Sequence, residues 1–513
     1  MYKSTPYFLF PLKFMLTQLT SFTTFGVSAI EIDVEIGVIP TSGDPRFLIV
    51  GLGDTAVQES KQRVMMALKS TGYRIPMGRI TTVNLAPAHI KKAGSGFDLP
   101  IALGLLFSDN VVDVPADALT DTAFLGELAL DGSLRHVTGV LACALACRRM
   151  GIKRLVLPAV NGAEAALVPG IEIIAVSNLR EVISCLRGEM SPPEIEPPAC
   201  APMIHTMVDF ADVRGQAQAK RALEIAAAGG HNVLLSGAPG SGKTLLANAL
   251  RGILPPLTRD ESLEVTGIYS VANLLPASTP LIEQRPLRAV HHTASAVAIV
   301  GGGQHPMPGE ISLAHRGVLF LDELSEFPSQ VLEVLRQPLE DRKITINRAQ
   351  GTVTFPADFI LVGAMNPPKY ASATAEKLKR RISAPLLDRI DLTIYVQPVE
   401  IADLQRKRDP MAETSDMIRQ RVSCARKKQG ERFKNAHIST NKEMGVKDIE
   451  FFCELDQKCE RLLRQAAERL GFSARAYHRT IKVSRTIADL APAENISEQH
   501  VAEALQYRQS IMG

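Results

Sequence analysis

The stretch VLLSGAPGSGKT, residues 233–244, decides how the rest of the chain is organised. A short apolar run, Val233 to Leu235, leads into a turn with the spacing GxxxxGK[ST], and a helix-patterned segment follows. Glycines let backbone N–H groups approach phosphates closely, and the amino-terminal end of the next helix attracts negative charge. The stretch therefore predicts a phosphate-binding loop, formed by Gly237, Ala238, Pro239, Gly240, Ser241, Gly242, Lys243 and Thr244.

Lys243 and Thr244 give this loop its expected chemistry. The lysine would reach the β- and γ-phosphates of ATP, and the threonine hydroxyl would hold Mg²⁺. A glycine-rich turn between a strand and a helix can match the pattern by chance. The apolar run before it and the helical pattern after it favour the phosphate site.

Two later apolar strands end in polar residues that suit the same reaction. Residues 318–321 run into Asp322 and Glu323, and residues 359–362 are followed closely by Asn366. Parallel strands bring their carboxyl ends to one edge of a sheet. We expect Asp322 to hold Mg²⁺ through water, Glu323 to polarise the attacking water, and Asn366 to orient water beside the γ-phosphate. Without the phosphate loop, Asp322 and Glu323 would be interpreted as a solvated acidic pair at a strand end, and Asn366 as a turn residue.

An arginine is also needed on the γ-phosphate, and a neighbouring subunit commonly supplies it. The segment LKRRISAPLLDRIDL offers Arg380, Arg381 and Arg389 near a helix-to-strand junction. We select Arg389. The alternative is a surface ion pair between Arg389 and Asp388 or Asp391.

Composition places the chain among globular proteins of several units. It has 513 residues, of which 46% are hydrophobic and 22% charged, and its net charge is only +3. Any basic nucleic-acid surface must therefore be local. The seven cysteines form no C-x-x-C pair, which favours reduced, mostly buried thiols. No apolar run is long enough to span a membrane, and no cleavage site follows the apolar opening, so we expect a cytoplasmic protein whose start is Met15.

The chain before the phosphate loop predicts a compact α/β unit. From Val27 apolar and acidic residues alternate, which indicates a half-buried strand. Strands and helices then follow one another, and one helix carries Val57, Val64, Met65 and Leu68 on a single face. Five prolines within residues 188–202 end this unit and predict an extended linker.

The chain from about Ile401 reads as helical. Residues 416–433 are strongly basic, which fits a solvated helix face and a nucleic-acid contact about equally well. A later helix begins at Ser473, and Arg475 in its first turn could reach the nucleotide from a helical lid. Arg479 and Arg485 are less favoured for that role.

Taken in order, these motifs resemble the magnesium-chelatase-like branch of the AAA+ ATPases, and more closely the bacterial YifB/ComM family. The similarity runs from about Met15 to Arg508. Its most specific segments are TVNLAPAHIKKAGSGFDLPIALGLL, LGELALDGSLRHVTGVL, RPLRAVHHTASAVAIVGGGQHPMPGEISLAHRGVLFLDELSEF, VLEVLRQPLED, AMNP, SAPLLDRIDL and SARAYHRTIKVSRTIADLA.

The resemblance implies a division of the chain and an activity. It implies an extension or misassigned start at 1–14, a Lon-protease-like α/β domain at 15–187, a linker at 188–207, an AAA+ core with a parallel sheet at 208–398, and a helical lid at 399–513. It also implies ATP and Mg²⁺ as cofactors, a homo-oligomeric ring that is hexameric, and remodelling of branched or single-stranded DNA, by branch migration or helicase action linked to recombination and natural transformation. The alternatives are a chelatase-type or chaperone-like ATPase that acts on a protein partner and, less favoured, an ATP-dependent protease.

Two departures from the family pattern bear on these expectations. Lon-type proteases use a serine nucleophile and a lysine base. Here Asp98 falls about where that serine would stand, and HVTGVLACA contains no lysine, so we expect the domain to be proteolytically inactive. Many relatives also carry a cysteine-containing loop after AMNP, whereas PPKYASATAEKLKR has no cysteine and cannot hold zinc through thiolates.

Overall fold

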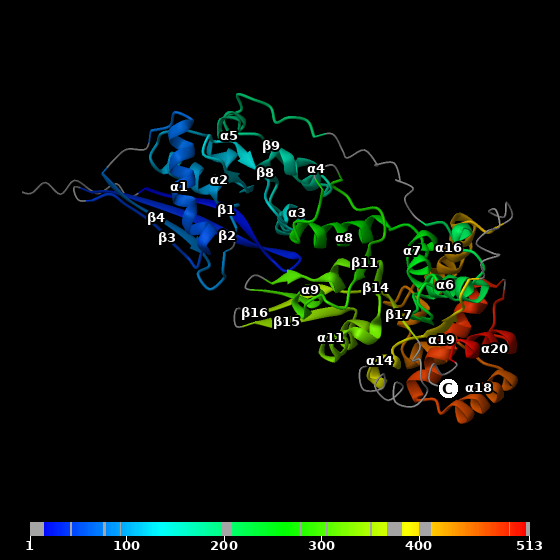
Figure 1. The fold of residues 1–513 in the computed structure, drawn as a ribbon. Coiled ribbons are helices and arrows are strands. Elements are labelled where there is room, and N and C mark those ends of the chain that lie inside the picture. Colours follow the sequence, from blue (N-terminus) through cyan, green and yellow to red (C-terminus); the bar gives the residue numbers. More distant parts are fainter. Residues whose placement is uncertain are drawn as a thin grey trace, which may run out of the picture.

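The computed structural model describes residues 15–41, 44–74, 78–92, 94–195, 208–276, 279–303, 306–348, 351–366, 382–399, 412–491 and 493–508. Residues 1–14, Arg380, Arg381, the cysteine-free loop and most of the proline-rich linker lie outside these ranges. In Figure 1 the amino-terminal sheet and the carboxy-terminal helices lie on opposite sides of the segment that carries the phosphate loop.

The amino-terminal part is built on a seven-stranded mixed sheet. Its central pair consists of β1 (Met15–Phe25) and β2 (Ser28–Pro40), which are antiparallel and joined by a turn at Gly26 with φ 63°. The predicted alternation is confirmed in β2, where Ile32, Val34 and Ile36 are fully buried. The sheet order is β3 (Arg46–Val50), β4 (Arg79–Ala86), β2, β1, β5 (Thr122–Phe124), β8 (Arg154–Pro158) and β9 (Glu172–Val176), with a separate ribbon of β6 (Glu127–Leu128) and β7 (Leu134–Arg135).

Helices cover this sheet and supply most of its core. The predicted face of α1 (Thr55–Ser70) is confirmed for Val57, Val64 and Leu68, but Met65 is 40% exposed because it lies one position off the buried stripe. The other helices of this part are α2 (Asp98–Ser108), α3 (Val140–Met150), α4 (Gly162–Ala165) and α5 (Leu179–Leu186).

The phosphate-loop part is built on a five-stranded sheet in which every pairing is parallel. The order is β11 (Leu287–Val290), β14 (Val318–Leu321), β17 (Ile360–Met365), β10 (Val233–Gly237) and β18 (Leu392–Val396). Its flanking helices are α6 (Ala217–Gly229), α7 (Lys243–Ile253), α8 (Arg259–Val271), α9 (Ala296–Val300), α10 (Glu310–Leu313), α11 (Ser329–Val334), α12 (Arg336–Asp341) and α14 (Ala384–Leu387). Two antiparallel ribbons accompany it, β12 (Gly301–Gly302) with β13 (Met307–Pro308) and β15 (Lys343–Arg348) with β16 (Gly351–Pro356).

The carboxy-terminal part is helical, as predicted, and shares a core with the phosphate-loop sheet. Ile418 and Val422 of α16 (Ser415–Arg432) and Val483 and Ile487 of α19 (Ala474–Leu490) are buried in the same cluster as Val233 of β10. Two α-helices lie between α16 and α19, α17 (Val446–Phe452) and α18 (Gln457–Leu470), and α20 (Glu498–Gln506) follows α19. No helix among the described residues is both long and apolar enough to cross a membrane.

The amino-terminal part is joined to the phosphate-loop part through α8. Val271, at the end of that helix, is buried in the cluster formed by α3 and its sheet. The hydroxyl of Ser270 donates to Glu164 at 2.5 Å, and the same carboxylate accepts the backbone N–H of Leu141 at 2.9 Å. Glu164 is 5% exposed, so this junction is a packed and hydrogen-bonded contact.

Candidate nucleotide site

The phosphate loop connects β10 to α7 with the backbone that the sequence predicts. Gly240 and Gly242 have φ values of 78° and 91°, a region that side chains disfavour. Gly237 has a different constraint, because a Cβ there would lie 2.4 Å from the carbonyl oxygen of Val396 on β18. The loop is closed by a hydrogen bond from the N–H of Ser241 to the carbonyl of Ala238 at 3.2 Å. Pro239 is exposed between them.

Lys243 lies across the mouth of this loop. Its Nζ donates to the carbonyls of Gly237 at 2.8 Å and Ala238 at 2.9 Å, and to Oδ1 of Asn366 at 3.1 Å. The residue is 8% exposed, and burial lowers the pKa of its amine below the ordinary value. The ammonium therefore already occupies a pocket made of oxygen atoms, which phosphate oxygens can replace.

Thr244 and Asp322 meet beside the lysine. Thr244 Oγ1 donates to Asp322 Oδ2 at 3.3 Å, and Asp322 Oδ1 accepts the N–H of Glu323 at 2.9 Å. Hydroxyl and carboxylate oxygens are the ligands that Mg²⁺ prefers, so these residues fit the ion that the sequence predicts. The parallel order β14, β17, β10 explains the convergence, because the three strands deliver Asp322, Asn366 and the loop to one sheet edge.

Glu323 follows Asp322 in a strained backbone conformation. Its φ of 51° is uncommon for a residue with a side chain. The carboxylate is 48% exposed, and its Oε2 lies 3.1 Å from Nδ1 of His292. The turn therefore carries Glu323 away from Asp322 and toward the end of β11.

A cavity next to the loop was not predicted from the sequence. It has a volume of about 250 Å³ and is lined by residues 214–219, where α6 begins, and by Tyr395 and residues 397–399, where β18 ends. Gly237 pairs with Val396, so the cavity adjoins the phosphate loop. Nε2 of Gln216 donates to the carbonyl of Gln397 at 2.5 Å and links the two walls. The walls are 181 residues apart, which left no local pattern to detect.

The two arginines selected from the sequence lie together. Arg389 contacts Oε1 of Glu340 at 2.6 Å, and Arg475 contacts the same oxygen at 3.2 Å. Arg389 is 4% exposed, whereas 56% of the Arg475 side chain is exposed. The alternative partners of Arg389 were Asp388 and Asp391, but its ion pair is with Glu340.

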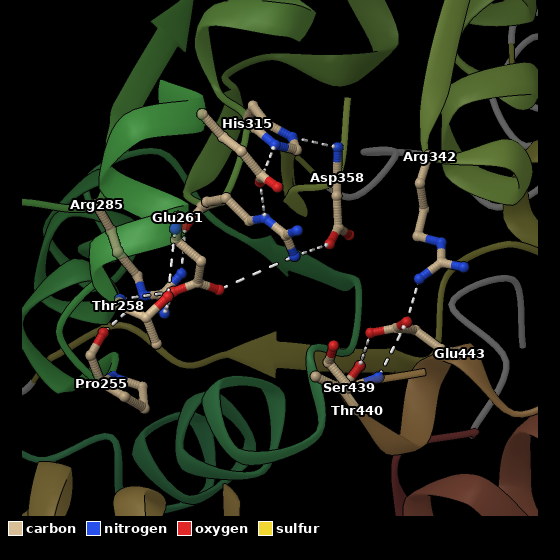
Figure 2. A network of polar contacts seen from close by, with 12 residues as sticks. Pro255, Thr258, Glu261, Arg285, His315, Arg342, Asp358, Ser439, Thr440 and Glu443 are labelled. Carbon is tan, nitrogen blue, oxygen red and sulfur yellow. Dashed lines mark hydrogen bonds and ion pairs between the residues drawn. The ribbon is translucent and has the colours of Figure 1, made fainter. Parts of the chain in front are cut away.

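The carboxy-terminal helices are bonded to the sheet edge opposite the phosphate loop. Nζ of Lys442 donates to Oδ1 of Asn232, just before β10, and to the carbonyl of Phe359, just before β17. Figure 2 shows Glu443 held between Arg342 of the sheet part and Ser439 and Thr440 of its own loop. The helices therefore lie behind the phosphate loop, at the opposite edge of the sheet.

A second group of charged residues lies near the sheet edge opposite the phosphate loop. Arg316 contacts Asp358 at 3.1 Å and Glu264 at 2.9 Å, and His315 also contacts Glu264 at 3.1 Å (Figure 2). These hydrogen bonds lower the pKa of Glu264 to about 2, with the His315 contact as the largest cause. Arg285 contacts Glu261 at 2.9 Å in the same network.

The basic helix α16 mostly anchors the helical part. Arg421 contacts Glu224 of α6 at 2.6 Å, Arg426 donates to the carbonyl of Ala227 at 2.8 Å, and Arg432 pairs with Asp489. The sequence left a solvated face and a nucleic-acid contact open, and these arginines are instead engaged within the chain. Arg479 and Arg485 are engaged likewise, with Asp391 and Asp489.

Asp98, at the position of the expected protease nucleophile, is part of a buried ion pair. Arg63 contacts its two oxygens at 2.7 and 3.0 Å, and the N–H of Leu128 donates to it at 3.2 Å. Burial raises the pKa of Asp98, and Arg63 opposes that shift. The carboxylate thus ties α1 to α2 and to β6.

A phosphate loop on an interior strand of a parallel sheet, with an acidic strand end at the same edge and helices behind it, is the AAA+ fold. Comparison with known protein families gives a match within each of the three parts of the chain. The family model for magnesium chelatase, subunit ChlI, matches residues 209–404, the model for subunit ChlI of Mg-chelatase matches residues 34–161, and the model for the carboxy-terminal part of ChlI matches residues 412–508.

Similar proteins span nearly the same length. Competence protein ComM of Haemophilus influenzae is 43% identical over 500 residues, which cover 94% of this chain and 96% of ComM. YifB of Escherichia coli is 40% identical over 495 residues, which cover 94% of this chain and 95% of YifB. A magnesium-chelatase 67 kDa subunit of Chlorobaculum parvum is 28% identical over 38% of this chain. The chain belongs to the YifB/ComM family of magnesium-chelatase-like AAA+ proteins.

Proposed function

We propose that this chain is an ATP-hydrolysing motor that assembles into a ring and remodels DNA. In this proposal residues 208–398 form the ATPase core, residues 399–513 form the helical lid, and residues 15–187 form a Lon-protease-like domain without protease activity. The family membership supports an AAA+ ATPase. The residue roles, the ring and the DNA substrate are our inference.

One observation carries the ATPase proposal, which is the convergence of Lys243, Thr244, Asp322 and Asn366 at a single sheet edge. Lys243 would exchange its carbonyl contacts for β- and γ-phosphate oxygens. Thr244 and Asp322 would hold Mg²⁺, which when bound neutralises charge on the phosphates. Glu323 would accept a proton from the attacking water, and Asn366 would hold that water in line.

In this proposal the cavity beside the phosphate loop binds the base of the nucleotide. Gln216, Gln218 and Gln397 line this cavity, and their side-chain amides can pair with the edge of a purine. Tyr395 lines the same cavity. Because this cavity adjoins the phosphate loop, a bound nucleotide would extend from Lys243 to Gln216. We therefore propose Gln216 and Gln397 as base-contacting residues.

Arg389 and Arg475 would act on the ATP of the neighbouring subunit. Both contact Glu340, and the helices that carry Arg475 lie behind the phosphate loop of their own chain. A site that needs arginine from a neighbour requires assembly, and a closed ring gives every subunit the same contact. We propose a hexamer, in which Glu340 releases the pair as the subunits close.

DNA is the substrate that the resemblance favours, and the name of the competence protein from Haemophilus influenzae supports it. The test measures ATP turnover by the full chain without DNA, with linear duplex and with a four-way junction, and the mass by light scattering with nucleotide present. We expect the junction to stimulate turnover and the branch point to move. No stimulation by any DNA would refute the DNA proposal.

Lys243→Ala tests the site in the same assay. A hydrogen bond to a charged group contributes about 1.5–3 kcal/mol, so ATP affinity should fall by about 10- to 150-fold and turnover should be lost. Lys458→Ala is the matched control, because Lys458 is an exposed lysine on α18. Normal turnover in Lys243→Ala would contradict the assignment of the site.

A second candidate is a chelatase-type or chaperone-like ATPase that acts on a protein partner. The matches of all three family models to magnesium-chelatase subunit ChlI favour it. ATP turnover that is indifferent to DNA but rises with a cognate protein partner would support this candidate.

A further inference from the structure

Two adjacent histidines lie opposite the acidic strand end, and the sheet register puts them there. β11 and β14 are parallel neighbours, and Val290 pairs with Leu321 at their carboxyl ends. The next residues are His291 and His292 on one strand and Asp322 and Glu323 on the other. Both pairs therefore leave the sheet at the same edge.

The local conformation then turns Glu323 toward the histidines. With φ at 51°, the backbone of Glu323 is in the left-handed region, a conformation that residues with a side chain disfavour. Its Oε2 lies 3.1 Å from Nδ1 of His292, and that nitrogen is shielded from solvent without a hydrogen bond of good geometry. The Glu323 oxygen and the His292 nitrogen are therefore close together, yet Nδ1 has no hydrogen bond.

The rings of the two histidines are close to one another. Their centroids lie 4.0 Å apart, and the edge of His292 packs on the buried ring of Phe327 at 6.5 Å. One donor atom from each of His291, His292 and Glu323 lies within 4.8 Å of the other two. Small side-chain rotations would bring these three atoms around a single ion.

The donor atoms of His291, His292 and Glu323 differ chemically from those of the neighbouring Mg²⁺ site. Two imidazoles and a carboxylate suit Zn²⁺, Co²⁺ or Ni²⁺, whereas the oxygens of Thr244 and Asp322 suit Mg²⁺. Consecutive residues, Asp322 and Glu323, would thus serve metals of different chemistry. We propose that His291, His292 and Glu323 form an inhibitory site for a divalent transition metal. This inference rests on the proposed role of Glu323 in ATP hydrolysis.

Occupation of this site would stop hydrolysis and spare nucleotide binding. A metal-bound carboxylate is a weaker base, because the metal cation competes with the proton for its oxygens, so Glu323 would no longer serve as the base for the attacking water. Lys243, Thr244 and Asp322 are not among the proposed ligands. The metal-bound chain would therefore bind ATP without hydrolysing it, as a chain with a non-functional base at Glu323 would.

The first experiment measures metal binding alone, so its result does not depend on ATPase activity. The full chain is stripped with EDTA, freed of nucleotide and Mg²⁺, and titrated with Co²⁺ while the visible d–d absorption is recorded. We expect one Co²⁺ per chain, displaced by Zn²⁺ but not by millimolar Mg²⁺. The double variant His291→Asn/His292→Asn should bind at least about 10-fold more weakly, since even outer-shell changes cost about 10- to 100-fold.

His136→Asn is the matched control, because His136 is an exposed histidine in the amino-terminal part. It should bind Co²⁺ like the unchanged chain. Equal Co²⁺ binding by the double variant and the unchanged chain would overturn the site.

The second experiment measures ATP turnover in excess Mg²⁺ with increasing Zn²⁺. We expect inhibition of the unchanged chain and of His136→Asn over the range in which Co²⁺ binding saturates. Turnover that persists with the metal site filled would overturn the inhibitory role. A chain that binds Co²⁺ through these histidines but never hydrolyses ATP would refute the proposed function and leave the metal site standing.

Discussion

Gly237→Ala is the substitution whose effect the geometry of the site predicts best. The added Cβ would lie 2.4 Å from the carbonyl oxygen of Val396 and 2.9 Å from Oγ of Ser241. Ordinary contact begins at 3.4 Å, so β10 and β18 would have to separate by about 1 Å. Overpacking of this kind costs about 1–3 kcal/mol. A loss of about 1 kcal/mol lowers the melting temperature of a unit of 150–250 residues by about 2–4 °C. We therefore expect the melting temperature of Gly237→Ala to be about 2–12 °C lower than that of the unchanged chain.

The same displacement reaches the site, because the carbonyl of Gly237 holds Lys243. A misplacement of about 1 Å can lower a rate about 100-fold, so ATP turnover should fall by that order. Gly430→Ala is the control, since Gly430 is exposed within α16 with no atom within 4 Å of the added carbon. It should stabilise the chain by about 0.5–1 kcal/mol and leave turnover unchanged. If Gly237→Ala melts and turns over like the unchanged chain, the close approach of the two strands is refuted.

Three further predictions follow from contacts described above. Glu323→Gln should bind ATP normally and hydrolyse it at least about 100-fold more slowly, and normal single-turnover kinetics would count against the proposed base. Arg63→Ala should lower stability by about 3–5 kcal/mol, because it leaves the Asp98 carboxylate buried and unpaired; thermal unfolding of Arg63→Ala with Asp98→Asn should show most of that loss restored. The pKa of Glu264 is about 2 in the fold against 4.5 ordinarily, so its stabilisation is complete above pH 4.5 and is lost as pH falls toward 2; urea midpoints of the unchanged chain and Glu264→Gln should converge in that window, and parallel curves would be inconsistent with it.

The strands that carry the site were predictable because they are buried on both faces. Residues 318–321 and 360–365 are continuous apolar runs, as central parallel strands require. β11 escaped prediction because it is an edge strand whose residues Leu287, Arg288 and Ala289 are not buried. β1 escaped for another reason, since its apolar residues Leu16, Leu19, Phe22 and Phe25 recur every third residue and not every second, which hides the strand pattern.

The site was predictable where one segment supplies both the residue and its position. The loop around Lys243 and the strand end at Asp322 are of this kind. The partner of Arg389 was not predictable from the sequence. Glu340 belongs to another helix, and any nearby carboxylate was an equal candidate. The cavity at Gln216 was also hidden, since its two walls come from segments 181 residues apart in the sequence.

The attachment of the amino-terminal sheet to α8 has a mechanical consequence. Ser270 and Val271 fix the α3 side of that sheet to α8, whereas β3 is the strand at the far end of the sheet order. Phe25 and Val27, where β1 ends and the turn to β2 begins, pack against the core of the phosphate-loop part as a second attachment, and β3 lies beyond both attachments in the sheet order. A rotation of the amino-terminal part about these attachments during a nucleotide cycle would displace β3 more than β1, because displacement grows with distance from the axis. In a ring, the edge at β3 would be the place where a fluorescent probe reports the cycle with the greatest amplitude.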